Sequence, residues 1–129
     1  MKRVLFVGQQ PDTVDFSDPS LPPGFDAEKI QAGIDIAETT MTERRWDADI
    51  CMIAPDDSGI STLAAELAKV DYDCVVIGGG LRIPPKGLLF FEKVVNAIHQ
   101  SSPKAAIALN TRPQDTAEAA ARWIDNYLH

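Results

Sequence analysis

Long apolar runs are absent from this chain of 129 residues, and their absence excludes one class of protein. No run approaches the roughly 20 apolar residues that a membrane-spanning helix requires, so we expect no membrane partner. The apolar stretch at residues 4–7 is shorter than the roughly 7–15 apolar residues of a signal peptide. The sequence therefore predicts a cytoplasmic protein whose first apolar stretch is a β-strand.

Positive charge is also scarce. The chain has 12 Lys and Arg residues against 19 Asp and Glu residues, which gives a net charge of −7. An acidic chain repels nucleic acid and anionic lipid. The densest basic pair, Arg44 and Arg45, falls at the end of a predicted helix, where basic residues complement the helix dipole. We therefore expect no nucleic-acid partner.

Cysteine is limited to Cys51 and Cys74. Their spacing forms neither a CxxC motif nor a zinc signature. Each cysteine lies at or near the start of an apolar run, as a small core residue does, and a disulfide is not expected in the cytoplasm. The sequence thus predicts two core thiols and no metal site, and it identifies no cofactor.

Short apolar runs, by contrast, recur regularly. They lie at residues 4–7, 50–54, 74–77 and 105–109. The runs are continuous, which is typical of parallel strands buried on both faces, and a helical pattern follows each of them. The sequence predicts a single α/β domain over residues 1–129, a three-layer sandwich around a four-stranded parallel sheet. We expect the strand order 2-1-3-4, the commonest small arrangement.

Three of the helical patterns carry one apolar stripe each, at the spacing that faces a sheet. Asp26 precedes the first pattern as a predicted N-cap. The stripe residues are Ile30, Ile34, Ala37 and Met41 in the first helix, Ile60, Leu63, Ala64 and Leu67 in the second, and Ala117, Ala120, Ala121, Ile124 and Leu128 in the fourth.

The third helical pattern, at about residues 86–100, is apolar over a wider surface than one sheet face requires. Its core stripe consists of Phe91, Val94, Val95 and Ile98. Leu88 and Phe90 widen this stripe, whereas Leu89 falls on the opposite side. Two interpretations are open: a deeply buried helix, or a homodimer contact through the helix that contains Leu89, Phe90 and Phe91.

One long irregular segment, at residues 8–25, follows the first predicted strand. It exceeds the roughly 12–15 residues beyond which structureless loops are usually functional or disordered, and its four prolines make it stiff. In open parallel sheets, ligands bind at the carboxyl ends of the strands where the strand order reverses. The predicted order places this segment beside the loop after the third strand.

That loop begins with glycine at residues 78–80, where the missing Cβ atoms let a ligand approach the backbone. The helix after it offers free N–H groups and a partial positive charge, and Arg82 adds a guanidinium that suits carboxylate or phosphate. The sequence predicts a site for an anionic small molecule. Its candidate residues are Gly8, Gln9, Asp12, Gly78, Gly79, Gly80, Arg82, Asn110 and Arg112. The structural alternative is a glycine turn crowded by a neighbouring helix, with both arginines in water.

No catalytic residue is identified from the sequence. Asp12, Asp15 and Asp18 could bind a hard cation or provide acid–base chemistry, but aspartate is also a common turn residue. No GxSxG motif occurs. Three functions remain open: a small-molecule binding protein, a homodimeric interaction or regulatory module, and a small enzyme that uses an aspartate of the first loop.

The layout resembles flavodoxin-like and receiver-like domains over the whole chain. The functional motifs of both differ, because residues 8–13 read GQQPDT instead of a Ser/Thr-rich phosphate loop, and the third strand ends in glycine instead of a phosphoacceptor aspartate. The Rossmann GxGxxG motif is also absent. Residues 73–78 and 91–96 are similar to segments of small uncharacterised bacterial α/β proteins. These resemblances imply a fold and a bacterial source, and no activity.

Overall fold

A computed structural model describes residues 1–19, 21, 23–81 and 87–125 of the chain. It contains a four-stranded sheet in the order β2-β1-β3-β4, in which every neighbouring pair is parallel. This arrangement confirms the predicted sheet and its order. The strands are β1 (Arg3–Gln9), β2 (Asp47–Ile53), β3 (Cys74–Ile77) and β4 (Ala106–Leu109).

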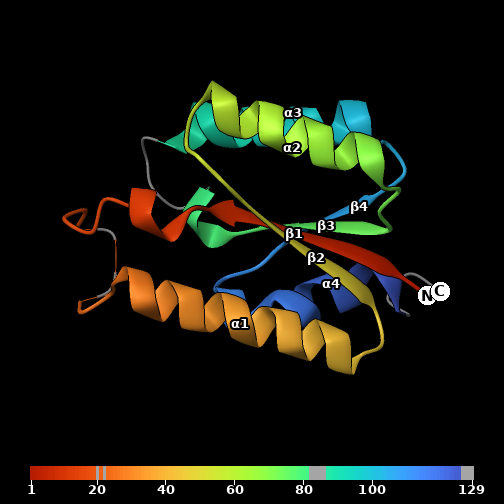
Figure 1. Cartoon of the computed structure of the whole chain (residues 1–129), viewed down its shortest axis with the longest axis horizontal. Coiled ribbons are helices and arrows are strands. Elements are labelled where there is room, and N and C mark those ends of the chain that lie inside the picture. Colours follow the sequence, from red (N-terminus) through yellow and green to blue (C-terminus); the bar gives the residue numbers. More distant parts are fainter. Residues whose placement is uncertain (20, 22, 82–86, 126–129) are drawn as a thin grey trace.

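Helices cover both faces of the sheet and make a three-layer sandwich (Figure 1). On one face lie α1 (Ala27–Glu43) and α4 (Thr116–Ile124), and on the other lie α2 (Asp57–Lys69) and α3 (Leu88–Ser101). The predicted N-cap is confirmed, because the carboxylate of Asp26 accepts a hydrogen bond from the backbone N–H of Lys29 at 2.9 Å. The domain therefore has the flavodoxin-like α/β architecture expected from the sequence.

The two central strands explain why the apolar runs are continuous. On β1, Val4 and Phe6 pack towards α1 and α4, whereas Leu5 and Val7 pack towards α2 and α3. All four side chains are buried, as is every residue of β3. Because β1 and β3 have neighbours on both sides and helices on both faces, each of their positions contacts apolar atoms.

The two edge strands differ in charge. β2 carries Asp47 and Asp49, whose carboxylates lie 3.6 and 3.1 Å from the guanidinium of Arg3 on β1. The hydrogen bond to Asp49 raises the pKa of Arg3. β4 has the sequence Ala-Ile-Ala-Leu and carries no charged side chain. Charged side chains on an edge strand oppose pairing with another sheet, so the charges of β2 protect its edge.

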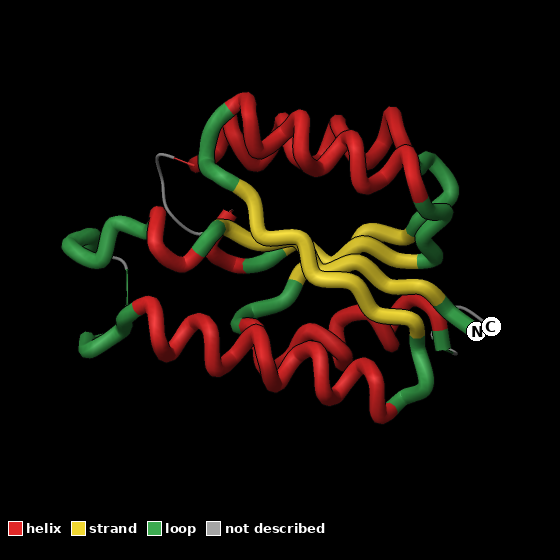
Figure 2. The backbone as a smooth tube through the Cα atoms, viewed as in Figure 1, coloured by secondary structure: helices red, strands yellow, loops and turns green. Residues whose placement is uncertain are grey.

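Several element boundaries differ from the sequence-based prediction. β2 begins at Asp47, three residues before the apolar run, because an edge strand tolerates charged residues on its exposed side. β1 extends to Gln9, so Gly8 and Gln9 belong to the strand, and a 3₁₀ turn, η1 (Pro11–Thr13), follows almost directly. The irregular segment after β1 is therefore shorter and more structured than expected (Figure 2).

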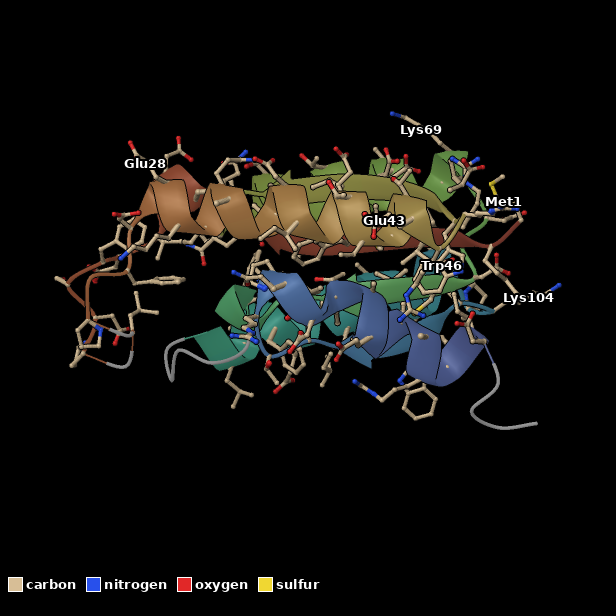
Figure 3. The ribbon with its side chains drawn as sticks, turned by 90° about the horizontal axis from the view of Figure 1, so that it is seen from below. Met1, Glu28, Glu43, Trp46, Lys69 and Lys104 are labelled. Carbon is tan, nitrogen blue, oxygen red and sulfur yellow. The ribbon has the colours of Figure 1, made fainter. Side chains whose placement is uncertain are left out.

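The end of α1 is tied to the end of α4 by one arginine. The guanidinium of Arg44 lies 5.3 Å from the ring centroid of the buried Trp46, and it is paired with Asp125 at 3.2 Å. Figure 3 shows Trp46 where α1 ends, beside α4. The basic pair expected to complement the helix dipole therefore also joins two helices through Arg44.

Within the described residues, no helix is both long enough and apolar enough to cross a membrane.

Gly59 in the first turn of α2 allows the helix to pack directly on the chain leaving β2. A Cβ built at this position would lie 1.9 Å from the backbone oxygen of Ala54. We expect Gly59→Ala to lower the free energy of unfolding by about 3 kcal/mol, because the clash is with backbone that cannot move aside. Urea denaturation followed by circular dichroism measures this change.

Gly80 provides the matched control. A Cβ built there meets no heavy atom of the described residues within 4 Å, and its φ is not in the left-handed region. Gly80→Ala should leave the free energy of unfolding unchanged or raise it by up to about 1 kcal/mol, because alanine restricts the unfolded chain. Equal losses in the two variants would contradict this account.

Candidate functional site

The strand order reverses between β1 and β3, so their carboxyl ends form the predicted switch point. The segments that leave these ends are η1 and a second 3₁₀ turn, η2 (Gly79–Leu81), and both lie at the same end of the sheet (Figure 1). The backbone N–H of Gly78 donates to the carbonyl oxygen of Val7 at 2.7 Å. The glycine loop therefore begins beside the last residues of β1, at the end of the sheet from which the first loop also leaves.

The three glycines after β3 have different environments. A Cβ at Gly78 would lie 3.2 Å from both the Phe6 ring and the carbonyl oxygen of Val7, so packing alone accounts for this glycine. Gly79 is buried, whereas Gly80 is exposed and faces open space among the described residues. Gly80 is thus the residue of this run whose backbone is open to a ligand, and packing does not explain its lack of a side chain.

Asn110 lies beside this loop and is 1% exposed. Its Oδ1 accepts a hydrogen bond from the backbone N–H of Gly79 at 2.9 Å, and its Nδ2 donates to the Thr116 hydroxyl at 3.0 Å. That hydroxyl in turn donates to the carbonyl oxygen of Pro113 at 2.7 Å. Asn110 therefore joins the loop after β3 to the start of α4, a structural role that the sequence did not reveal.

The candidate residues of the first loop also make contacts within the fold. The side-chain amide of Gln9 donates to the carbonyl and hydroxyl oxygens of Thr13, at 3.0 and 3.2 Å, and so holds the η1 turn. A Cβ at Gly8 would lie 2.9 Å from the sulfur of Met52, so this glycine makes room for a side chain of β2. Asp12 is exposed in η1.

A shallow hollow of about 330 Å³ lies beside these residues, between η1 and the start of α1. Its lining consists of Pro11, Asp12, Ala27, Glu28 and Gln31. The sequence analysis did not select Glu28 or Gln31, although their three-residue spacing on a helix places both on one face. Figure 3 shows Glu28 at the start of α1. Two carboxylates and one amide suit a cation or a hydrogen-bond donor better than an anion.

The carboxyl end of β2 contributes a further negative charge. Asp56 accepts hydrogen bonds from the hydroxyl of Ser58 and the backbone N–H of Gly59, which hold the pKa of Asp56 below its usual value. This carboxylate therefore stays ionised at neutral pH and caps α2. Together, the carboxylates of Asp12, Glu28 and Asp56 give the carboxyl ends of β1 and β2 an acidic surface among the described residues.

Of the two predicted guanidinium groups, Arg112 is exposed between β4 and α4, and Arg82 lies outside the described residues. The neighbour of Arg112, Thr111, is held by Asp115, whose carboxylate accepts from both the backbone N–H and the hydroxyl of Thr111. Across the part of the chain that the structure describes, no group of three or more His, Cys, Asp or Glu side chains is arranged to hold a metal ion.

A second candidate surface lies along α3 and the β4 edge. Lys93 of α3 lies 3.0 Å from Asp57 of α2, so the Lys93 flank of α3 faces α2. The opposite flank of α3 therefore lies towards the β4 edge, where Ile107 and Leu109 point to the same side of the sheet. We call this surface the edge strip, and its residues are Leu88, Phe91, Val95, Ile107 and Leu109.

The edge strip is apolar and partly open to solvent. Leu88 is 62% exposed and Leu109 is 39% exposed, whereas Phe91, Val95 and Ile107 are half-buried. Leu89 is 67% exposed on the outer side of α3, and Phe90 is half-buried and packs against the core on this face of the sheet. The structure thus divides the wide apolar surface of this helix into a buried face and an exposed flank.

The chain matches no protein-family model and no curated protein.

The structural role of the Asn110 side chain, which links Gly79 to Thr116, can be tested by replacing it with alanine. Asn110→Ala would leave a buried N–H at Gly79 and the Thr116 hydroxyl without this partner, so we expect the free energy of unfolding to fall by about 2–4 kcal/mol. Gln9→Ala, which removes a half-buried amide, should lower it by about 1 kcal/mol. Denaturant titration of both variants checks this, and a loss at Asn110 no larger than that at Gln9 would contradict it.

Proposed function

We propose that this protein works as a homodimeric interaction module and that the edge strip is its contact surface. The observation that carries the proposal is the exposure of Leu88 and Leu109 beside the uncharged strand β4. Contiguous apolar surface on a soluble domain commonly marks an interaction site. Burying a leucine contributes about 1.5–3 kcal/mol, and a two-fold contact buries each residue of the strip twice.

Charge restricts where two copies can meet. Each copy carries a net charge of −7, so two copies repel each other at long range. The β2 edge presents Asp47 and Asp49 and therefore opposes self-association. β4, by contrast, has no charged side chain of its own, so its edge lacks the carboxylates that oppose self-association at the β2 edge.

Light scattering after size-exclusion chromatography tests the dimer directly. We expect the wild-type protein to have the mass of a dimer, and Leu88→Glu to have the mass of a monomer, because it buries a charge in the contact. Ile36→Glu is the matched control, since Ile36 is 44% exposed on α1, on the other face of the sheet. A wild-type protein that stays monomeric at several hundred micromolar would overturn the proposal.

A second candidate function, binding of an anionic small molecule at the carboxyl ends of the strands, is favoured by one specific observation. The N-cap of α3 is Gly87, no described side chain caps the helix, and its first turn has no acidic residue; the open Gly80 precedes it in the chain. Free N–H groups at a helix start attract phosphate or carboxylate. The acidic residues around η1 limit such a ligand to the α3 side of the switch point.

A thermal shift assay tests this second candidate. With inorganic phosphate, AMP or citrate at concentrations above the dissociation constant, the melting temperature of the wild-type protein should rise, since a ligand that binds only the folded state stabilises it. Gly80→Val should abolish the rise by blocking the backbone, whereas Lys29→Ala on α1 should retain it. No shift with any of the three ligands at millimolar concentration would reject this function.

A further inference from the structure

We propose that Glu66, Tyr72 and Asp49 form a proton-binding site, which ties the last turn of α2 to the β2 edge and holds this tie more tightly in mild acid. The three residues belong to α2, to the segment before β3 and to β2. The site lies at the β2 edge of the sheet, whereas the edge strip lies along β4 at the other edge. The inference is therefore independent of the proposed homodimer.

The hydroxyl group of Tyr72 lies between two carboxylates. Its oxygen is 2.7 Å from Oδ2 of Asp49 and 2.8 Å from Oε1 of Glu66, and both are distances of O–H···O hydrogen bonds. Tyr72 as a whole is 4% exposed, so its ring is fixed by packing. One phenol oxygen therefore joins a helix to an edge strand through two short contacts.

The number of protons available to these contacts is too small. A phenol has one proton, and an ionised carboxylate can only accept a hydrogen bond. Tyr72 can therefore donate to one carboxylate at a time, which leaves the other pair of oxygens without a proton between them. A proton bound to one of the two carboxyl groups supplies the missing donor, because that group then donates to the phenol oxygen. The geometry thus favours uptake of one proton.

The neighbouring cations decide which carboxyl group takes this proton. Oδ2 of Asp49 also accepts a hydrogen bond from the guanidinium of Arg3 at 3.1 Å, and such a charged donor favours the ionised carboxylate. Glu66 lies 3.7 Å from the ammonium of Lys69, whose side chain is 71% exposed, so water weakens this ion pair. The added proton therefore binds Glu66, and the donors run from Glu66 to Tyr72 to Asp49.

The other ionisable groups around the site agree with this assignment. The carboxylates of Asp47 and Asp73 lie on either side of Arg3, and their negative charge favours a bound proton. Burial raises the pKa of the Cys51 thiol, so Cys51 adds no charge at neutral pH. Burial and the hydrogen bonds to both carboxylates also raise the pKa of Tyr72, so the phenol keeps its own proton.

Folding therefore increases the affinity of this site for a proton. In the unfolded chain Glu66 has no phenol held beside it, so the folded state binds the proton more tightly. A group of this kind adds stability as the pH falls through its titration, whereas a carboxylate in an ion pair loses stability in acid. The attachment of α2 to β2 should thus strengthen under conditions that weaken ion pairs such as Arg44–Asp125.

Glu66→Gln tests the proposal, because its amide N–H can donate to the phenol oxygen at any pH. Urea denaturation is compared at about pH 8, where an ordinary glutamate is ionised, and at about pH 5, closer to its ordinary pKa. The midpoint of the variant should exceed that of the wild-type protein at the higher pH, and this gap should narrow at the lower pH. The comparison between two proteins cancels the effect of every other titrating group.

Glu38→Gln is the matched control, since Glu38 is exposed on α1. Its gap from the wild-type protein should be the same at both pH values. In a Tyr72→Phe background the gap caused by Glu66→Gln should also lose its pH dependence, because no phenol oxygen remains to accept the bond. A gap that persists unchanged in this background would show that Tyr72 does not hold the proton.

Carboxyl-carbon NMR of the wild-type protein provides a readout that does not depend on the folding of any variant. Glu66 should take up its proton at a higher pH than Glu38 in the same spectra. If the two glutamates titrate together, or if the Glu66→Gln gap is equal at both pH values, the proton-binding site does not exist. Either result would leave the proposed homodimer untouched, because light scattering measures that property separately.

Discussion

Burial of β1 and β3 on both faces is the constraint on which the rest of the structure depends. Neither strand has a side that can face water, so helices must cover both faces of the sheet and the chain must cross from face to face. Within the sheet, the exposed positions are therefore confined to the two edge strands and to the strand ends. Both candidate surfaces of this protein occur in these two places.

At the carboxyl ends of the strands, most of the residues predicted to bind a ligand have a structural role in the fold. Gln9 holds the η1 turn, Gly8 and Gly78 make room for their neighbours, and Asn110 joins two loops. These contacts make the switch point well ordered, because buried polar groups without partners would destabilise it. They also leave Gly80 and the first turn of α3 as the open part of the site.

The asymmetry of the two sheet edges provides the stronger functional signal. A charged edge such as β2 resists pairing with other chains, whereas β4 combines an uncharged sequence with a flank of exposed apolar side chains. The proposed homodimer rests on this asymmetry.

The sequence by itself determined the secondary structure and the architecture, because apolar periodicity reports directly which faces of a segment are buried. It also placed the loops after β1 and β3 at one end of the sheet. Only the tertiary structure decided what each site residue contacts, since the bond between Asn110 and Gly79 joins residues far apart in the chain. It likewise decided which flank of α3 is exposed: Lys93 pairs with Asp57 of a different helix, and such long-range packing leaves no periodic signal in the sequence.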